Sequence, residues 1–185
     1  MKKFSYYAFY KPYGIVSQFT GDKPEETLSV FNLPKNIYAA GRLDKDSEGL
    51  LLLTDDGNFI NQLLNPKNEK PKTYHVQVEN IPDEEALKQF RNGLMIEEYT
   101  TKKAKVKIID DPGYPERNPP VRFRKTIPTC WLEVEIIEGK NRQVRKMTAK
   151  IGHPTLRLIR VKIGKLSLEN MRPGELKEII KDDII

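Results

Sequence analysis

The segment Gly41–Leu50 (GRLDKDSEGL) holds the side chains best suited to chemistry, an arginine at Arg42 and an aspartate at Asp44. It lies between two short apolar runs that predict strands, and it has glycines near both ends. A compact loop of this kind can hold a polar side chain at the end of the strands of a sheet, where binding and catalytic residues often lie. Two interpretations are open. Asp44 is a catalytic carboxylate, or the segment is a connecting turn whose charged side chains are solvated.

A second segment, Lys72–Val78 (KTYHVQV), has the period-two alternation of a strand. That alternation places Tyr74, Val76 and Val78 on one face of the strand. Tyr74 is therefore either a core residue or an aromatic platform at the end of an apolar face. His75 points to the other face, and we interpret it as structural.

A third segment, Gly139–Met147 (GKNRQVRKM), leads into a helix predicted over Arg142–Ile151. Arg142, Arg145 and Lys146 lie on a different side of this helix from its apolar positions. Cations in the first turn are disfavoured by the helix dipole. The early arginines therefore indicate an anionic neighbour: a carboxylate, an RNA phosphate, or both. A guanidinium suits either one, because it can bond two oxygens at once and stays charged when partly buried.

Basic residues gather toward the end of the chain. The net charge is +6, and the stretch Lys140–Lys165 has nine lysines and arginines and no acidic residue. A polyanion-binding surface requires a local excess of this kind. A solvated helix face in a basic protein would look the same from charge alone.

The elements that must position these segments are short. Strands are predicted at Tyr6–Tyr10, Tyr38–Ala40, Leu50–Thr54, Lys72–Val78, Lys103–Ile109, Trp131–Ile137 and Thr155–Val161. Helices are predicted at Asn58–Leu64, from a cap at Asp83 to Asn92, and at Arg142–Ile151. Because helices and strands do not alternate regularly, the pattern favours an α+β fold on a largely antiparallel sheet. The segment Asp110–Pro128, with five prolines, is predicted to be a surface loop.

Several classes of protein are disfavoured by composition. The single cysteine, Cys130, cannot form an internal disulfide and fits a reducing, cytoplasmic location. His75, His153 and Cys130 show none of the paired spacings of zinc sites, so no metal is expected. No apolar run approaches the roughly 20 residues that cross a membrane, and the first residues do not form a signal peptide.

The three segments resemble the motifs of a known family. GRLDKDSEGLLLLTDDG (Gly41–Gly57) is similar to the signature motif of the bacterial ribosomal pseudouridine synthases of the RsuA-like branch. KTYHVQV and GKNRQVRKMTAKIGHPTLRLIR resemble its second and third motifs, in the family order and spacing. The resemblance covers nearly the whole chain. It implies the pseudouridine synthase fold, a mixed, mostly antiparallel sheet flanked by helices with two lobes around a central cleft. It also implies one catalytic domain over residues 1–185, without the N-terminal S4 domain that many relatives have.

The resemblance also implies an activity, the isomerisation of a specific uridine in 23S ribosomal RNA to pseudouridine, without cofactor or metal. The target uridine must be flipped out of its stack to be reached. In this interpretation Asp44 is the carboxylate that acts on the nucleotide, Arg145 pairs with it, and Tyr74 stacks on the target base. Arg42 fills the vacated space or holds the flipped backbone, and Leu158 packs on the other side of the base.

Arg142 and Lys146, within the basic stretch, are expected to bind RNA phosphates. A monomer in the cytoplasm is expected, since the partner is a large RNA. Two other functions stay open: a non-catalytic RNA-binding or ribosome-assembly protein that uses the same basic face, and a pseudouridine synthase that acts on another RNA.

Overall fold

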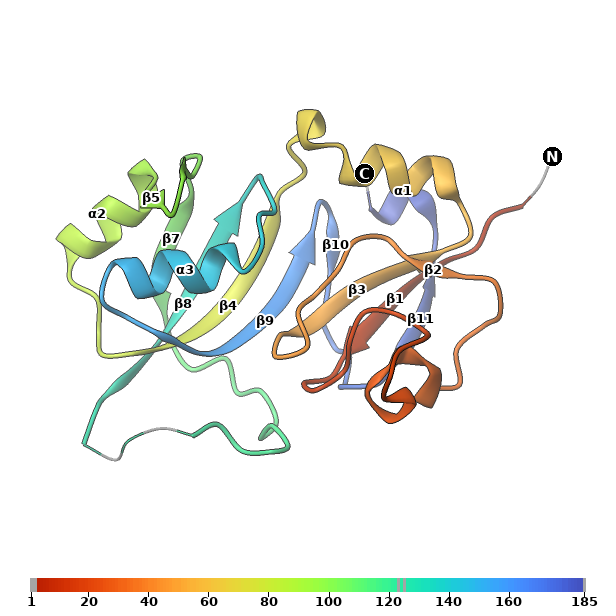
Figure 1. Ribbon diagram of the computed structural model, residues 1–185, viewed down its shortest axis with the longest axis horizontal. Helices are drawn as coiled ribbons and strands as arrows, with labels where there is room; N and C mark the ends of the chain where they lie inside the picture. The colour runs from red at the N-terminus through yellow and green to blue at the C-terminus, as the bar shows by residue number, and fades with distance from the viewer. Residues whose placement is uncertain (1–2, 123, 125, 185) are drawn as a thin grey trace. The chain divides into compact units, whose positions relative to one another are not determined.

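A computed structural model describes residues 3–122, 124 and 126–184, and the chain divides into two compact units (Figure 1). The first unit comprises residues up to Lys70 together with those from Arg160 onward, and the second comprises Pro71–Ile159. Strand β9 (Thr155–Ile163) begins in the second unit and ends in the first. The two units are described separately below.

The first unit is built on an antiparallel sheet in which β1 lies between β11 and β3. Short strand β2 pairs with the end of β3, and β10 forms a hairpin with the end of β9. Its strands are β1 (Tyr6–Lys11), β2 (Tyr38–Ala39), β3 (Glu48–Thr54), β10 (Leu166–Ser167) and β11 (Leu176–Ile179). Its helices are α1 (Gly57–Leu64) and the 3-10 turns Pro24–Glu26, Leu28–Val30, Pro66–Asn68 and Lys181–Asp183.

Strand β3 is the centre of this unit, because all seven of its residues are buried. A continuous run of four leucines is what a strand covered on both faces requires. On one face, Leu51 and Leu53 join a core cluster with Phe9, Leu28 and Ile37. The sequence between β1 and β2 thus forms one wall of the core.

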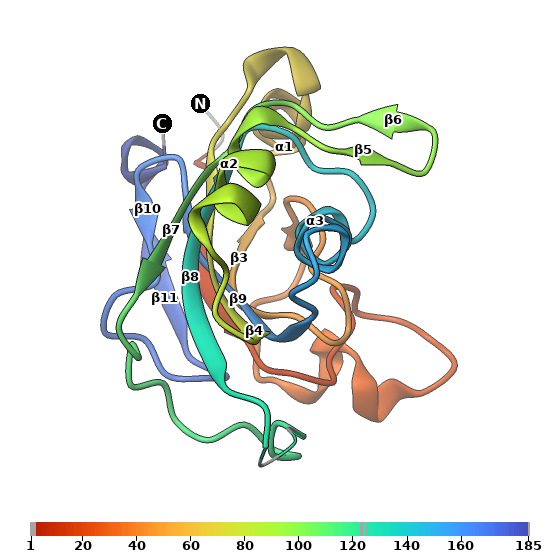
Figure 2. The same cartoon turned by 90° about the vertical axis from the view of Figure 1, so that its left-hand side faces the viewer.

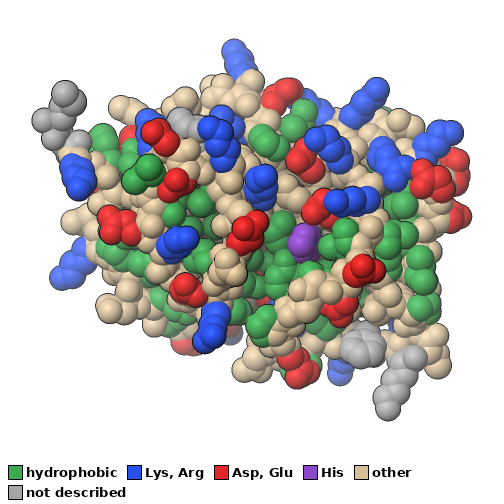
Figure 3. Space-filling view, turned by 180° about the vertical axis from the view of Figure 1, so that it is seen from behind, with side chains coloured by type: hydrophobic (Ala, Val, Ile, Leu, Met, Phe, Trp, Pro, Cys, Tyr) green, Lys and Arg blue, Asp and Glu red, His purple; other side chains and the backbone are tan. Residues whose placement is uncertain are grey.

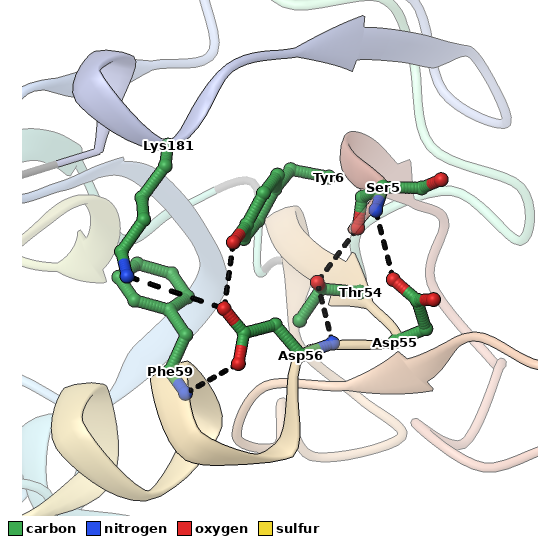
Figure 4. Close-up of polar contacts among 7 residues, drawn as sticks. All are labelled: Ser5, Tyr6, Thr54, Asp55, Asp56, Phe59 and Lys181. Carbon is green, nitrogen blue, oxygen red and sulfur yellow. Dashed lines mark hydrogen bonds and ion pairs between the residues drawn. The ribbon is translucent and has the colours of Figure 1, made fainter. Parts of the chain in front are cut away.

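Asp56 caps helix α1, because its side chain accepts a hydrogen bond from the Phe59 backbone N–H at 3.0 Å. The Tyr6 hydroxyl donates to the other oxygen of Asp56 at 2.7 Å, and Lys181 Nζ lies 4.0 Å from that same oxygen (Figure 4). A capping carboxylate satisfies a helix N–H that has no partner within the helix. Here it also ties β1 and the end of the chain to the start of α1.

The second unit contains the antiparallel strand order β4–β8–β7, two α-helices and the small β5–β6 hairpin, which extends past α3 in Figure 2. Its strands are β4 (Lys72–Glu79), β5 (Met95–Ile96), β6 (Tyr99–Thr100), β7 (Lys105–Ile109) and β8 (Thr129–Ile136). Its helices are α2 (Glu84–Asn92) and α3 (Gln143–Lys150).

The sheet of the second unit has an apolar face and a charged face. Tyr74 pairs with Val134 in the register of β4 and β8, and both side chains are buried. The neighbouring position places His75 opposite Glu133, which also accepts from Lys107 at 2.8 Å. Acidic and basic side chains are likewise interleaved in the view of Figure 3. The alternation predicted for Lys72–Val78 is confirmed.

The α+β class is confirmed, and most element bounds shift by one or two residues. The strand expected at Lys103 begins at Lys105, because the Ala104 N–H donates to the Arg91 carbonyl of α2 instead of to the sheet. Strand β9 continues past Val161 because its end pairs with β10. The strands β5, β6, β10 and β11 were not predicted. The described residues between Asp110 and Pro128 form no helix or strand, in accord with the predicted loop.

Helix α3 starts one residue later than predicted. Arg142 has φ 52° and ψ 30°, a left-handed conformation, and no side-chain hydrogen bond caps the helix from this position. The Gln143 side chain bonds to the turn before the helix, because its Oε1 accepts from the Lys140 backbone N–H at 3.0 Å. Gln143 Nε2 in turn donates to Glu138, so a buried amide fixes the turn that leads into the helix.

Candidate active-site segments

The loop that contains Asp44 lies in the first unit, between β2 and β3. The Asp44 side chain is partly buried, and Arg42 is exposed. The Ser47 N–H donates to the Asp44 carbonyl at 3.0 Å, which closes a turn directly after the aspartate. The loop therefore has a defined backbone, as expected for a segment that presents one side chain.

The same loop is bonded to the segment that follows β1. The Ser17 hydroxyl donates to the Leu43 carbonyl and accepts from the Leu43 N–H, both at 2.9 Å. The Gly14 N–H donates to the Lys45 carbonyl at 2.8 Å. Asp44 thus stands between two residues whose backbones are held by another part of the chain.

Buried cations lie beside this loop. Lys11 is fully buried at the end of β1, and its ammonium group donates to the carbonyls of Pro12 and Ile15. Burial lowers the pKa of Lys11 to about 7, and the charges of Glu48, Asp46 and Asp44 oppose that shift. The Lys11 charge is therefore close enough to interact with the Asp44 carboxylate.

Arg160 is the second buried cation, and its Nε donates to the Leu50 carbonyl at 2.8 Å. A Cβ on Gly49 would stand 2.3 Å from the Arg160 carbonyl oxygen, so only glycine fits there. The sequence motifs indicate no role for Lys11 or Arg160. The sequence signal for Lys11 is its position, because it is a lysine at the end of an apolar strand and directly before a proline.

The second unit holds the remaining candidate residues. Tyr74 lies on the apolar face of β4 and is 8% exposed, and Leu158 of β9 is 5% exposed. Arg142 is exposed and precedes α3, while Arg145 is partly buried within it. The Tyr74 and Leu158 side chains are thus largely covered within this unit, and a small part of each stays exposed.

Lys146 forms an ion pair on the basic side of α3. Its Nζ lies 2.9 Å from Glu97 Oε1 in the turn of the β5–β6 hairpin. The anionic neighbour expected for Arg142 and Arg145 stays a prediction. His75 is held on the charged face by the Tyr114 hydroxyl at 2.6 Å, which agrees with its interpretation as structural.

The candidate residues thus form two groups, Asp44 and Arg42 in the first unit, and Tyr74, Arg145 and the other predicted residues in the second. The described residues contain no group of three or more His, Cys, Asp or Glu side chains that could hold a metal ion. The helices in the described part of the chain are too short or too polar to cross a membrane.

Comparisons with known proteins define the class. The family described as RNA pseudouridylate synthase matches residues 5–150. Ribosomal large subunit pseudouridine synthase E of Vibrio vulnificus is 54% identical over 171 residues, which are 92% of this chain and 73% of that protein. The synthase E of Xanthomonas campestris pv. campestris is 52% identical over 168 residues, covering 89% of this chain and 90% of that protein. A crystal structure of a pseudouridylate synthase superposes with a TM-score of 0.80 at 29% identity, over 99% of this chain and 73% of that one.

This chain belongs to the RNA pseudouridylate synthase family. The expected enzyme class, an RNA pseudouridine synthase, and the expected fold are therefore confirmed.

Proposed function

We propose that this enzyme isomerises one uridine of 23S ribosomal RNA in the cytoplasm and that Asp44 is its catalytic carboxylate. The names of the Vibrio and Xanthomonas relatives, both ribosomal large subunit synthases, support the choice of RNA. The observation that carries the choice of Asp44 is its setting. It is a partly buried carboxylate on a loop bonded from both sides, beside the buried ammonium of Lys11.

The reaction detaches uracil from C1′ of the ribose, rotates it and rejoins it through C5, so it requires neither a metal nor a cofactor. Asp44 would attack C1′, attack C6, or remove the 2′ proton, and each of these roles requires an ionised carboxylate. A positive charge nearby offsets the loss of water around that carboxylate. Lys11, whose pKa burial lowers to about 7, supplies one such charge when it is protonated, and Arg145 is proposed to supply the other by pairing with Asp44.

The uridine must leave its stack before Asp44 can act on it. Flipping a base costs a few kcal/mol, and stacking on one aromatic ring returns about 1–3 kcal/mol. Stacking on Tyr74 would therefore only about balance the flip. Arg42, whose side chain is exposed, is proposed to fill the vacated space, and Leu158 to pack on the other side of the base.

Phosphate contacts would supply the remaining free energy. Arg142 and Lys146 are the proposed phosphate ligands. Each phosphate that they neutralise would release counterions, and that release favours RNA binding. We propose that residues 1–185 act as one catalytic domain, in a monomer.

The test is pseudouridine mapping on 23S ribosomal RNA that lacks the modification. After incubation with the protein, carbodiimide treatment and primer extension should show one new stop. Asp44→Asn should abolish that stop and leave RNA binding nearly unchanged. Asp22→Asn makes the same chemical change at an exposed position of the same unit and should be as active as the unaltered protein. Substantial turnover by a homogeneous Asp44→Asn preparation would refute the assignment. A stop only in transfer RNA would refute the proposed substrate.

A further inference from the structure

The backbone on both sides of Asp44 is held by one short segment, Gly14–Ser17. Ser17 contacts the residue before the aspartate and Gly14 contacts the residue after it. Because Asp44 has a fixed neighbour on each side and a turn bond of its own to Ser47, its Cα has little freedom to move. The position of the carboxylate then depends on groups outside its own loop.

Ser17 makes the stronger of these two attachments. Its hydroxyl both donates to and accepts from the backbone of Leu43, at 2.9 Å in each case. Ser17 is 9% exposed and Leu43 is 7% exposed, so little water is available to replace either bond. A buried backbone group that loses its partner carries the full cost of its desolvation. Without the hydroxyl, the Leu43 backbone would have to move toward other partners, and Asp44 would move with it.

The attachment after Asp44 is supported from a third segment. The Gly14 N–H bonds the Lys45 carbonyl at 2.8 Å, and the Lys45 ammonium lies 2.5 Å from Glu26 Oε2. Gly14 has φ +82°, a conformation that residues with a Cβ rarely adopt. The chain after β1 is therefore shaped so that a backbone N–H faces the loop.

We propose that Ser17 is a positioning residue for the reaction, because it sets the place of the Asp44 carboxylate through the Leu43 backbone. This inference rests on the proposed role of Asp44. A displacement of about 1 Å at a reacting group can lower a rate about 100-fold. Ser17→Ala should therefore slow the chemical step by about 10- to 100-fold. RNA affinity should stay within about threefold, because Ser17 is buried away from solvent.

The decisive measurement is the single-turnover rate constant with enzyme in excess over RNA labelled with tritium at uridine C5. Tritium leaves when C5 bonds to the ribose, so its release follows the chemistry. A merely structural role would lower the melting temperature and the reaction amplitude, but the folded fraction would keep the normal rate constant. Ser17→Thr retains a hydroxyl and should restore the rate to within about threefold, whereas Ser17→Cys keeps the size with a much weaker hydrogen bonder and should remain slow.

Ser29→Ala is the matched control, because that hydroxyl bonds Thr27 and Pro24 in its own turn and is exposed. Normal rate constants for Ser17→Ala and Ser17→Cys would overturn the inference, as would a Ser17→Thr variant as slow as Ser17→Ala. If Asp44→Asn itself turns over, the proposed function fails. If Asp44→Asn is inactive and the Ser17 variants are fast, only the positioning role fails.

Discussion

Replacing Glu97 by glutamine should tighten RNA binding, although it adds no contact to RNA. Glu97 lies in the turn of the β5–β6 hairpin, and its carboxylate is 2.9 Å from the ammonium of Lys146. The Lys146 side chain is 26% exposed and that of Glu97 is 63% exposed. If Lys146 binds a phosphate, the RNA must first displace this carboxylate.

The size of the effect follows from the strength of the ion pair. An exposed pair contributes about 0–1 kcal/mol to stability. Releasing Lys146 from it can therefore strengthen RNA binding at most about fivefold, at about 1.4 kcal/mol for each factor of ten. Lys146→Ala should do the opposite, and it should lower the slope of log affinity against log salt by about 0.9 for the lost phosphate contact.

Fluorescence anisotropy with a 23S ribosomal RNA fragment, between about 50 and 200 mM KCl, would measure both quantities. Glu98→Gln is the control, because it changes the net charge equally at the next, exposed position of the turn. Equal tightening by both glutamine variants would mean that net charge alone explains the gain. An unchanged salt slope in Lys146→Ala would show that this lysine does not bind phosphate, and the competition argument would fail with it.

Variants at four further positions test the site and the fold. Tyr74→Phe should bind RNA normally, and Tyr74→Ala should lose about 1–3 kcal/mol of stacking free energy in the same binding assay; equal weakening would rule out the stacking role. Arg145→Ala should lower the single-turnover rate more than the affinity, and an effect on affinity alone would make it a phosphate ligand. Burial lowers the pKa of His75, so the folded protein binds fewer protons and its free energy of unfolding should drop as the pH falls below about 6.5; His75→Gln should flatten that dependence in urea titrations. The Tyr6 hydroxyl lowers the pKa of Asp56, so Tyr6→Phe should cost about 1–2 kcal/mol at neutral pH. That difference should shrink as the pH falls from about 5 toward 3, and a constant difference would contradict the pairing.

The elements that could be predicted from the sequence are those whose structure depends on residues close together in the chain. The alternation of Tyr74, Val76 and Val78 matches one buried face of β4. Asp83 caps α2 by accepting from the Ala86 N–H at 2.8 Å, as the sequence indicated. Each of these features depends on residues within a few positions, so the local sequence is sufficient to predict it.

The start of α3 could not be predicted in the same way. Periodicity correctly indicated a helix, but it assigned Arg142 to the first helical position. The left-handed backbone at Arg142 accompanies a network in which Glu138 accepts from both Gln143 and the Lys102 N–H. The Lys102 contact crosses 36 positions of sequence. No local pattern contains that contact, so the conformation of the turn depends on tertiary structure.

The setting of Asp44 follows the same rule, with a larger consequence for function. The residue types of its loop make Asp44 a candidate but leave a solvated turn equally open, and only the family resemblance assigns it the catalytic role. Ser17, which holds the loop, lies 26 positions before Leu43, bonds to backbone atoms of that residue and has no periodic signal of its own. A side chain that bonds to backbone places no demand on the identity of the residue it contacts. Sequence reasoning therefore finds a candidate reacting group more readily than the residue proposed to position it. The single-turnover rate of a Ser17 variant is the measurement that would connect the two.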